Sequence, residues 1–94
     1  MNSDNIEIKV IISGKVQGVF YRAETKKAAD KLNIKGYVKN LSDGSVEAVF
    51  NADQSKINHM IKWCHKGPAA SRVDNILTQR IEQSENFDTF EIRY

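Results

Sequence analysis

The chain has 94 residues, of which 40% are hydrophobic and 28% charged, and this composition predicts a single globular domain spanning residues 1–94. Its net charge of +2 is too small to indicate a strongly basic nucleic-acid-binding protein. The lone cysteine excludes an intramolecular disulfide framework and a multi-cysteine metal site.

The N-terminal region lacks the signals of secretion and of membrane insertion. Residues 1–4 are polar, and no basic segment followed by an apolar run and a cleavage site comes after them. The longest apolar run, Val10-Ile11-Ile12, has three residues, whereas a membrane-spanning helix needs about twenty. With the single thiol of Cys64, these features predict a cytoplasmic protein that does not enter a membrane.

A strand, a helix and a hairpin are predicted in the first half of the chain. Apolar residues alternate from Ile6 to Ile12, which is the period of a strand that ends at Gly14. An amphipathic helix follows, with a stripe formed by Tyr21, Thr25, Ala28 and Leu32 and flanked by Ala29. Residues 37–41 and 45–50 form two strands joined by a turn at 42–44, where Gly44 can take a positive φ.

A second helix and two further strands are predicted in the second half. The helix has Ile57, Met60, Ile61 and Cys64 on one face, with Asp53 as its N-cap and Gly67-Pro68 as its stop signal. A strand at 73–83, a turn at 84–86 and a short strand at 90–94 follow. The order β-α-β-β-α-β plus a short last strand predicts a ferredoxin-like α+β two-layer sandwich, with both helices on one face of an antiparallel sheet.

The link between the first strand and the first helix is one candidate site. Backbone N–H groups at a helix N-terminus can cradle a phosphate, and Gly18 allows the preceding loop to curl. Arg22 lies in the first helical turn, where the helix dipole disfavours a cation unless an anion binds beside it. The pattern matches neither a Walker A motif nor G-x-G-x-x-G, so nucleotide binding is not supported. A plain loop with a surface arginine is the alternative.

Asn40 is the second candidate. Asparagine is depleted in strands, and Asn40 interrupts a segment of strand-forming residues. Its amide can orient a water molecule without adding negative charge beside an anion. The alternative is that Asn40 only begins the turn.

Together these two segments resemble the acylphosphatase family. VQGVFYR at 16–22 is similar to that family's V-Q-G-V-x-F/Y-R loop, and GYVKN at 36–40, with Gly44 and Val46, to its G-F/Y/W-A/V-x-N-x-x-x-G-x-V motif. The similarity extends to Trp63, to 67–74 and to 90–94. Ala52 stands where the family often has glycine, which puts the backbone of a turn after the third strand in doubt.

The resemblance implies hydrolysis of the carboxyl–phosphate bond of small acyl phosphates. Arg22 would bind the phosphate together with the backbone N–H groups of Val16, Gln17, Gly18, Val19, Phe20 and Tyr21, and Asn40 would hold the attacking water. Neither a cofactor nor a metal is expected, since His59 and His65 are six residues apart and lack a carboxylate cluster. We expect a monomer that binds no nucleic acid.

Two other functions remain open from sequence. One is an acylphosphatase-like domain that binds without hydrolysing. The other is an RNA-binding domain of the same fold, which Lys35-Gly36-Tyr37-Val38 partly matches, although on the second strand instead of the third. Residues 15–39 carry seven basic and two acidic residues, which either attract anions or form a solvated helix face. Trp63 is expected to pack beside the core, and Cys64 to be a buried, inert thiol.

Overall fold

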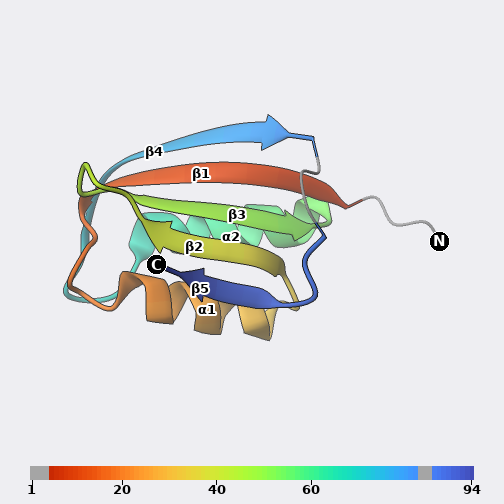
Figure 1. The fold of residues 1–94 in the computed structure, drawn as a ribbon, viewed down its shortest axis with the longest axis horizontal. Helices are drawn as coiled ribbons and strands as arrows, with labels where there is room; N and C mark the ends of the chain where they lie inside the picture. The colour runs from red at the N-terminus through yellow and green to blue at the C-terminus, as the bar shows by residue number, and fades with distance from the viewer. Residues whose placement is uncertain (1–4, 83–85) are drawn as a thin grey trace.

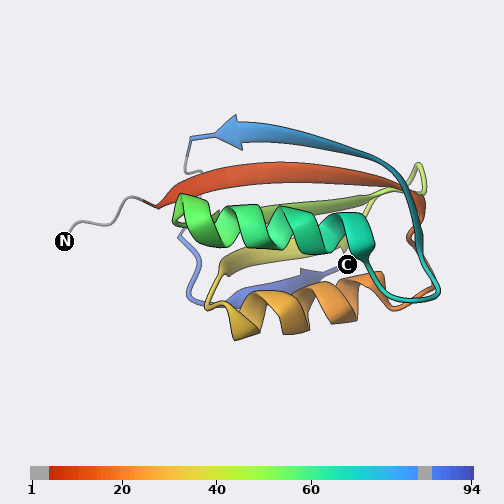
Figure 2. The same ribbon diagram turned by 180° about the vertical axis from the view of Figure 1, so that it is seen from behind.

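The computed structural model describes residues 5–82 and 86–94. Its elements are β1 (Ile6–Lys15), α1 (Tyr21–Lys31), β2 (Lys35–Asn40), β3 (Val46–Ala52), α2 (Gln54–Lys66), β4 (Arg72–Ile81) and β5 (Phe90–Arg93). Both helices cover one face of the sheet (Figures 1 and 2), which confirms the two-layer α+β architecture. Among the described residues, no helix is long and apolar enough to span a membrane.

The sheet has the strand order β4-β1-β3-β2-β5. Four of its strands pair antiparallel, as predicted. The prediction of a wholly antiparallel sheet is wrong for one pair, because β5 lies parallel to β2, with Val38 opposite Ile92. β5 runs in the opposite direction to β4, but it lies at the other edge of the sheet, where its neighbour β2 runs the same way.

The core lies between the sheet and the helices. Ile8, Val10 and Ile12 of β1 are buried, as the alternation predicts. In the predicted α2 stripe, Ile57, Met60 and Cys64 are fully buried, whereas Ile61 is only partly buried at the edge of the core. In α1 the buried residues are Tyr21, Thr25 and Ala29, whereas the predicted Ala28 and Leu32 are only partly buried at the edge of the core. A small side chain at Ala29 lets α1 approach the sheet closely.

The caps of α2 are those predicted. Asp53 accepts a hydrogen bond from the amide of Lys56 at 2.9 Å, and Gly67 ends the helix with φ 61°. Gly44 has φ 96° in the hairpin turn.

Two other expectations about the backbone change. Ala52 is the buried last residue of β3, opposite Ile6, and has no positive φ, so the position does not need glycine. The predicted strand at 73–83 ends at Ile81. Gln83 and residues 84–85 of the predicted turn lie outside the described residues.

Candidate active site

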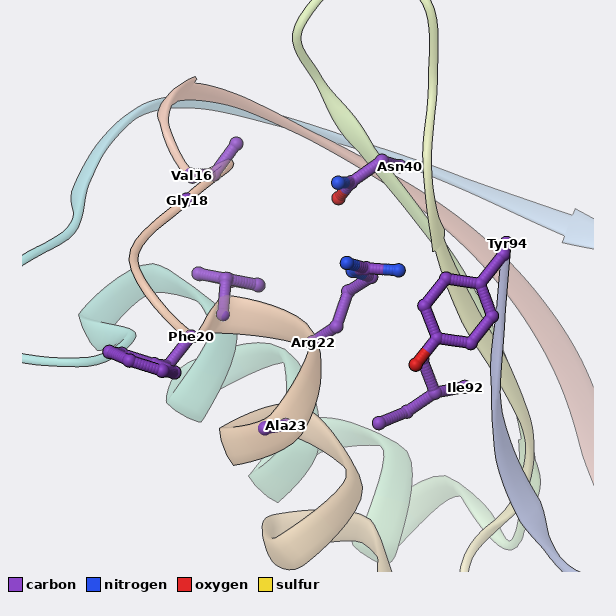
Figure 3. Close-up of a pocket in the computed structure, with 9 residues that line it drawn as sticks. Val16, Gly18, Phe20, Arg22, Ala23, Asn40, Ile92 and Tyr94 are labelled. Carbon is purple, nitrogen blue, oxygen red and sulfur yellow. The ribbon is translucent and has the colours of Figure 1, made fainter.

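A cavity of about 300 Å³ lies where the β1–α1 loop, the end of β2 and the end of β5 meet (Figure 3). It is lined by Val16, Gly18, Phe20, Tyr21, Arg22, Ala23, Asn40, Ile92 and Tyr94. The fold therefore brings Arg22 and Asn40 together with four of the six predicted loop residues. Gln17 and Val19 do not line the cavity.

The β1–α1 loop turns its backbone toward the cavity and its valine side chains into the core. Val16 and Val19 are 1% and 7% exposed, so they anchor the loop at two points. Gly18 and Phe20 have φ of 75° and 64°, and left-handed residues in alternation with others form anion-binding concavities of N–H groups. Within the described parts of the chain, the N–H groups of residues 17–23 donate no hydrogen bond to protein. They are free to bind a ligand.

Gly18 lies in the loop at a point where the protein leaves open space for a side chain. A Cβ atom added there would have no heavy atom of the protein within 4 Å. Packing therefore does not require glycine at this position. The left-handed φ of 75° favours glycine there instead.

Phe20 is the N-cap of α1, a role that the sequence does not reveal. It caps the helix without a side-chain hydrogen bond, and its side chain is 80% exposed. A left-handed conformation is unfavourable for a bulky residue, and such strain concentrates at functional sites. Because Phe20 has no side-chain acceptor, no cap side chain competes with a ligand for the first N–H groups of α1.

Arg22 reaches from α1 across the cavity to β5. Its Nη1 donates to the carbonyl oxygen of Arg93 at 3.4 Å, and its guanidinium carbon lies 4.8 Å from the centre of the Tyr94 ring. These two contacts orient the side chain but do not neutralise its charge. No carboxylate among the described residues forms an ion pair with Arg22. The site thus contains an oriented cation that lacks an anion.

Asn40 ends β2 and faces Arg22 across the cavity (Figure 3). Its Oδ1 is buried and accepts no hydrogen bond. Leaving a buried acceptor unpaired costs about 1–3 kcal/mol, so the fold retains an unfavourable feature here. A water molecule between Asn40 and the loop would supply the missing donor.

Gln17 has a positioning role that sequence reasoning missed. Its Nε2 donates to the carbonyl oxygens of Leu41 and Ser45, both at 2.8 Å. These carbonyls belong to the β2–β3 turn directly after Asn40. Gln17 therefore fixes the loop relative to the residue that faces it. The bare motif gives no signal of this, because the two partners are 24 and 28 residues away.

The side chain of Tyr21 is structural, although its backbone belongs to the loop. It is 1% exposed, donates from its hydroxyl to the carbonyl oxygen of Cys64 at 2.7 Å, and packs against Trp63 with ring centres 5.6 Å apart. Burial raises the pKa of Tyr21 well above its usual range. Burial also raises the pKa of the Cys64 thiol to about 12, which keeps it protonated.

Most of the positive charge predicted for residues 15–39 lies away from the cavity. On α1, Lys26 pairs with Asp30 at 2.9 Å and Lys27 with Glu24 at 3.3 Å. Among the described residues that line the cavity, Arg22 is the one with a charged side chain. His59 and His65 are exposed on α2, and no group of three or more metal-ligating side chains occurs among the residues that the structure describes.

Comparisons with known proteins identify the family of the chain. A family model described as acylphosphatase matches residues 8–92. The chain is 44% identical to an acylphosphatase of Natronomonas pharaonis over 91 residues, which cover 97% of this chain and 98% of that protein. It is 40% identical to an acylphosphatase of Rubrobacter xylanophilus over 86 residues, or 92% of this chain and 78% of that one.

A solved structure shows the same fold. The structure of an acylphosphatase from Coxiella burnetii superimposes with a TM-score of 0.90 at 38% identity, covering 95% of this chain and 93% of that one. The sequence match, the structural match and the arrangement of the cavity lead to one conclusion: the chain belongs to the acylphosphatase family.

Proposed function

We propose that this chain hydrolyses acyl phosphates to a carboxylate and inorganic phosphate, with Arg22 and Asn40 as its catalytic residues. The observation that carries the proposal is that, among the described residues, one cavity contains both an unpaired cation and a buried hydrogen-bond acceptor without a donor. Arg22 is a cation without an ion-pair partner among the described residues, and Asn40 has a buried acceptor without a donor. A phosphate and an attacking water would satisfy both.

The phosphate oxygens would bind between the loop and Arg22. The free N–H groups of residues 17–23 donate from one side, and the guanidinium donates from the other. Arginine suits this role because its planar group matches two phosphate oxygens at once. Phosphoryl transfer requires mainly positioning and charge stabilisation from the protein, and both kinds of group here are fixed before the substrate arrives.

The attacking water would donate a hydrogen bond to Oδ1 of Asn40 through a proton that it keeps. Its oxygen bonds to phosphorus as the bond between phosphorus and the acyl oxygen breaks, and the carboxylate leaves with the electron pair. The leaving group needs no proton, because carboxylic acids have a pKa of about 4. The water's second proton passes to an oxygen of the substrate's own phosphate.

The reaction proceeds without a general base from the chain. No histidine, aspartate or glutamate is among the described residues that line the cavity. Such a base is not required when the transition state is loose, because the attacking water then carries little charge early in the reaction. A neutral amide also avoids repulsion between the water's holder and the anionic substrate.

The test is steady-state hydrolysis of benzoyl phosphate. We expect Arg22→Ala and Asn40→Ala each to lose about 100-fold or more in kcat, as when one electrostatic or positioning group is removed. Lys27→Ala serves as the matched control on α1, because Lys27 is exposed and does not line the cavity. Unchanged thermal unfolding would exclude misfolding of the variants. Near wild-type rates in either alanine variant would refute the assignment, and no turnover by the wild type would favour a non-hydrolysing binding domain.

We further propose that residues 1–94 act as one domain, as a monomer in the cytoplasm, on a small-molecule substrate and without nucleic acid. Tyr37, the aromatic residue that suggested RNA binding, is engaged by the protein itself. The Arg93 guanidinium lies 4.3 Å from the centre of the Tyr37 ring, and the Tyr37 hydroxyl donates a hydrogen bond to Glu47 at 2.7 Å. Sedimentation velocity and filter binding with single-stranded RNA test these two partner proposals.

A further inference from the structure

The proposed chemistry uses only part of the cavity. The phosphate and the water occupy the part near Gly18, Arg22 and Asn40. Among the other described residues that line the cavity, three are apolar or aromatic and come from α1 or from the end of β5. We call them the acyl lip: Ala23, Ile92 and Tyr94.

The geometry of the reaction directs the acyl group away from Asn40. Attack and departure are roughly in line through phosphorus, so the leaving oxygen lies opposite the water. Ile92 pairs with Val38, two residues before Asn40 on β2, a separation of about 7 Å along a strand. Ala23 is one residue further into α1 than Arg22. In Figure 3 the Arg22 guanidinium lies between Asn40 on one side and Ala23 and Ile92 on the other.

The acyl lip is largely exposed, although its residues are apolar. Tyr94 is 97% exposed, Ala23 is exposed as well, and Ile92 is partly buried. Exposed apolar side chains that gather at a cavity are typical of a binding surface.

We propose that the acyl lip binds the acyl group and gives the enzyme a preference for acyl phosphates with apolar or aromatic acyl groups. This inference rests on the proposed function. The described residues lining the cavity include one cation, Arg22, which the phosphate engages. A second anionic group on the acyl side would meet no further cationic side chain among the described residues that line the cavity, and it would gain nothing from contact with apolar side chains. The enzyme therefore discriminates against acyl groups that carry a further charge.

The first experiment needs no variant. Acetyl, butanoyl and hexanoyl phosphate are compared with the wild-type enzyme. The three acids are of similar strength, so the leaving groups are matched and only the contacts of the acyl chain differ. We expect kcat/KM to rise about tenfold from acetyl to hexanoyl phosphate, because the chain is partly buried. The gain should appear as a lower KM at nearly constant kcat, since these contacts are equal in the ground and transition states.

The second experiment reverses the preference by charge. Ala23→Lys and Ala23→Glu are assayed with benzoyl phosphate and 4-carboxybenzoyl phosphate, and each variant is judged by the ratio of the two kcat/KM values. That ratio cancels any general effect of the new charge on phosphate binding. We expect Ala23→Lys to move the ratio about two- to fivefold toward the carboxylated substrate, and Ala23→Glu to move it the other way. Asn58→Lys, an exposed position on α2 outside the cavity, should leave the ratio unchanged.

The outcomes of these experiments distinguish failure of this inference from failure of the proposed acyl phosphate hydrolysis. Equal kcat/KM for all three alkanoyl phosphates would overturn the acyl lip while leaving acyl phosphate hydrolysis intact. Absence of turnover with any acyl phosphate would overturn the proposed function itself. A ratio that shifts as much in Asn58→Lys as in Ala23→Lys would place the charge effect outside the lip and would also overturn the inference.

Discussion

The two hydrogen bonds of Gln17 predict a variant that damages catalysis more than stability. Gln17→Met keeps an unbranched side chain of similar length but removes both donors to the β2–β3 turn. A hydrogen bond contributes about 0.5–1.5 kcal/mol net. The two carbonyls keep other partners: Leu41 O accepts from Gly44 N at 3.3 Å, and Ser45 O from Leu41 N at 2.9 Å. The loss should therefore total about 1–2 kcal/mol.

The catalytic loss follows from geometry. Without Gln17 the loop that holds the phosphate is no longer fixed to the turn that follows Asn40. A shift of about 1 Å between reacting groups can cost about 100-fold in rate, so we expect kcat to fall about 10- to 100-fold. Phosphate affinity depends on the loop and Arg22, which stay intact. The inhibition constant for inorganic phosphate should therefore change by less than about threefold.

The assay is benzoyl phosphate hydrolysis with phosphate as competitive inhibitor, together with urea unfolding. Gln54→Met is the matched control, because Gln54 makes one exposed hydrogen bond, to Asn58 at 2.8 Å on α2. It should change the free energy of unfolding by no more than about 0.5 kcal/mol. An unchanged kcat in Gln17→Met, or a fall in kcat matched by an equal weakening of phosphate binding, would refute the positioning role.

Three further predictions concern the fold and the chemistry. Asp53→Ala removes the α2 cap and should lower the free energy of unfolding by about 0.5–2 kcal/mol without changing kcat, as measured by urea unfolding and activity. Because the Cys64 thiol keeps its proton up to a pKa of about 12 against 9.0 for an unperturbed thiol, its contribution to stability is complete below pH 9. It should be lost as pH rises toward 12, at about 1.4 kcal/mol per pH unit, and this slope should be absent in Cys64→Ala. Activity should survive EDTA, since the carboxylate leaves without a Lewis acid; loss on chelation that Mg²⁺ restores would contradict this.

The parts of the fold set by local interactions could be predicted from the sequence. The alternation in β1, the stripe of α2 and the Asp53 cap each depend on residues a few positions apart, and all three are confirmed. Pairing of β5 with β2 could not be predicted, because it joins strands about fifty residues apart and is decided by packing at the sheet edge. The buried face of α1 moved from Ala28 to Ala29 for the same reason: the sheet selects which residue it covers.

The candidate site shows the same division. The resemblance to the acylphosphatase family placed Arg22 and Asn40 together, and the structure brings both to one cavity. The side-chain partners of Gln17 and the left-handed backbone of Phe20 depend on where the turn and the helix finally lie. Neither feature could be predicted from a short stretch of sequence, and both help to set the conformation of the loop at the cavity.

The parallel docking of β5 has a consequence for how the protein comes to be active. Arg22 is oriented by the carbonyl of Arg93, a residue 71 positions later in the chain. Contacts between such distant segments form late and slowly, because a long loop must close first. Recovery of turnover during refolding should therefore lag behind recovery of secondary structure. During synthesis on the ribosome, the chain would be inactive until β5 had emerged.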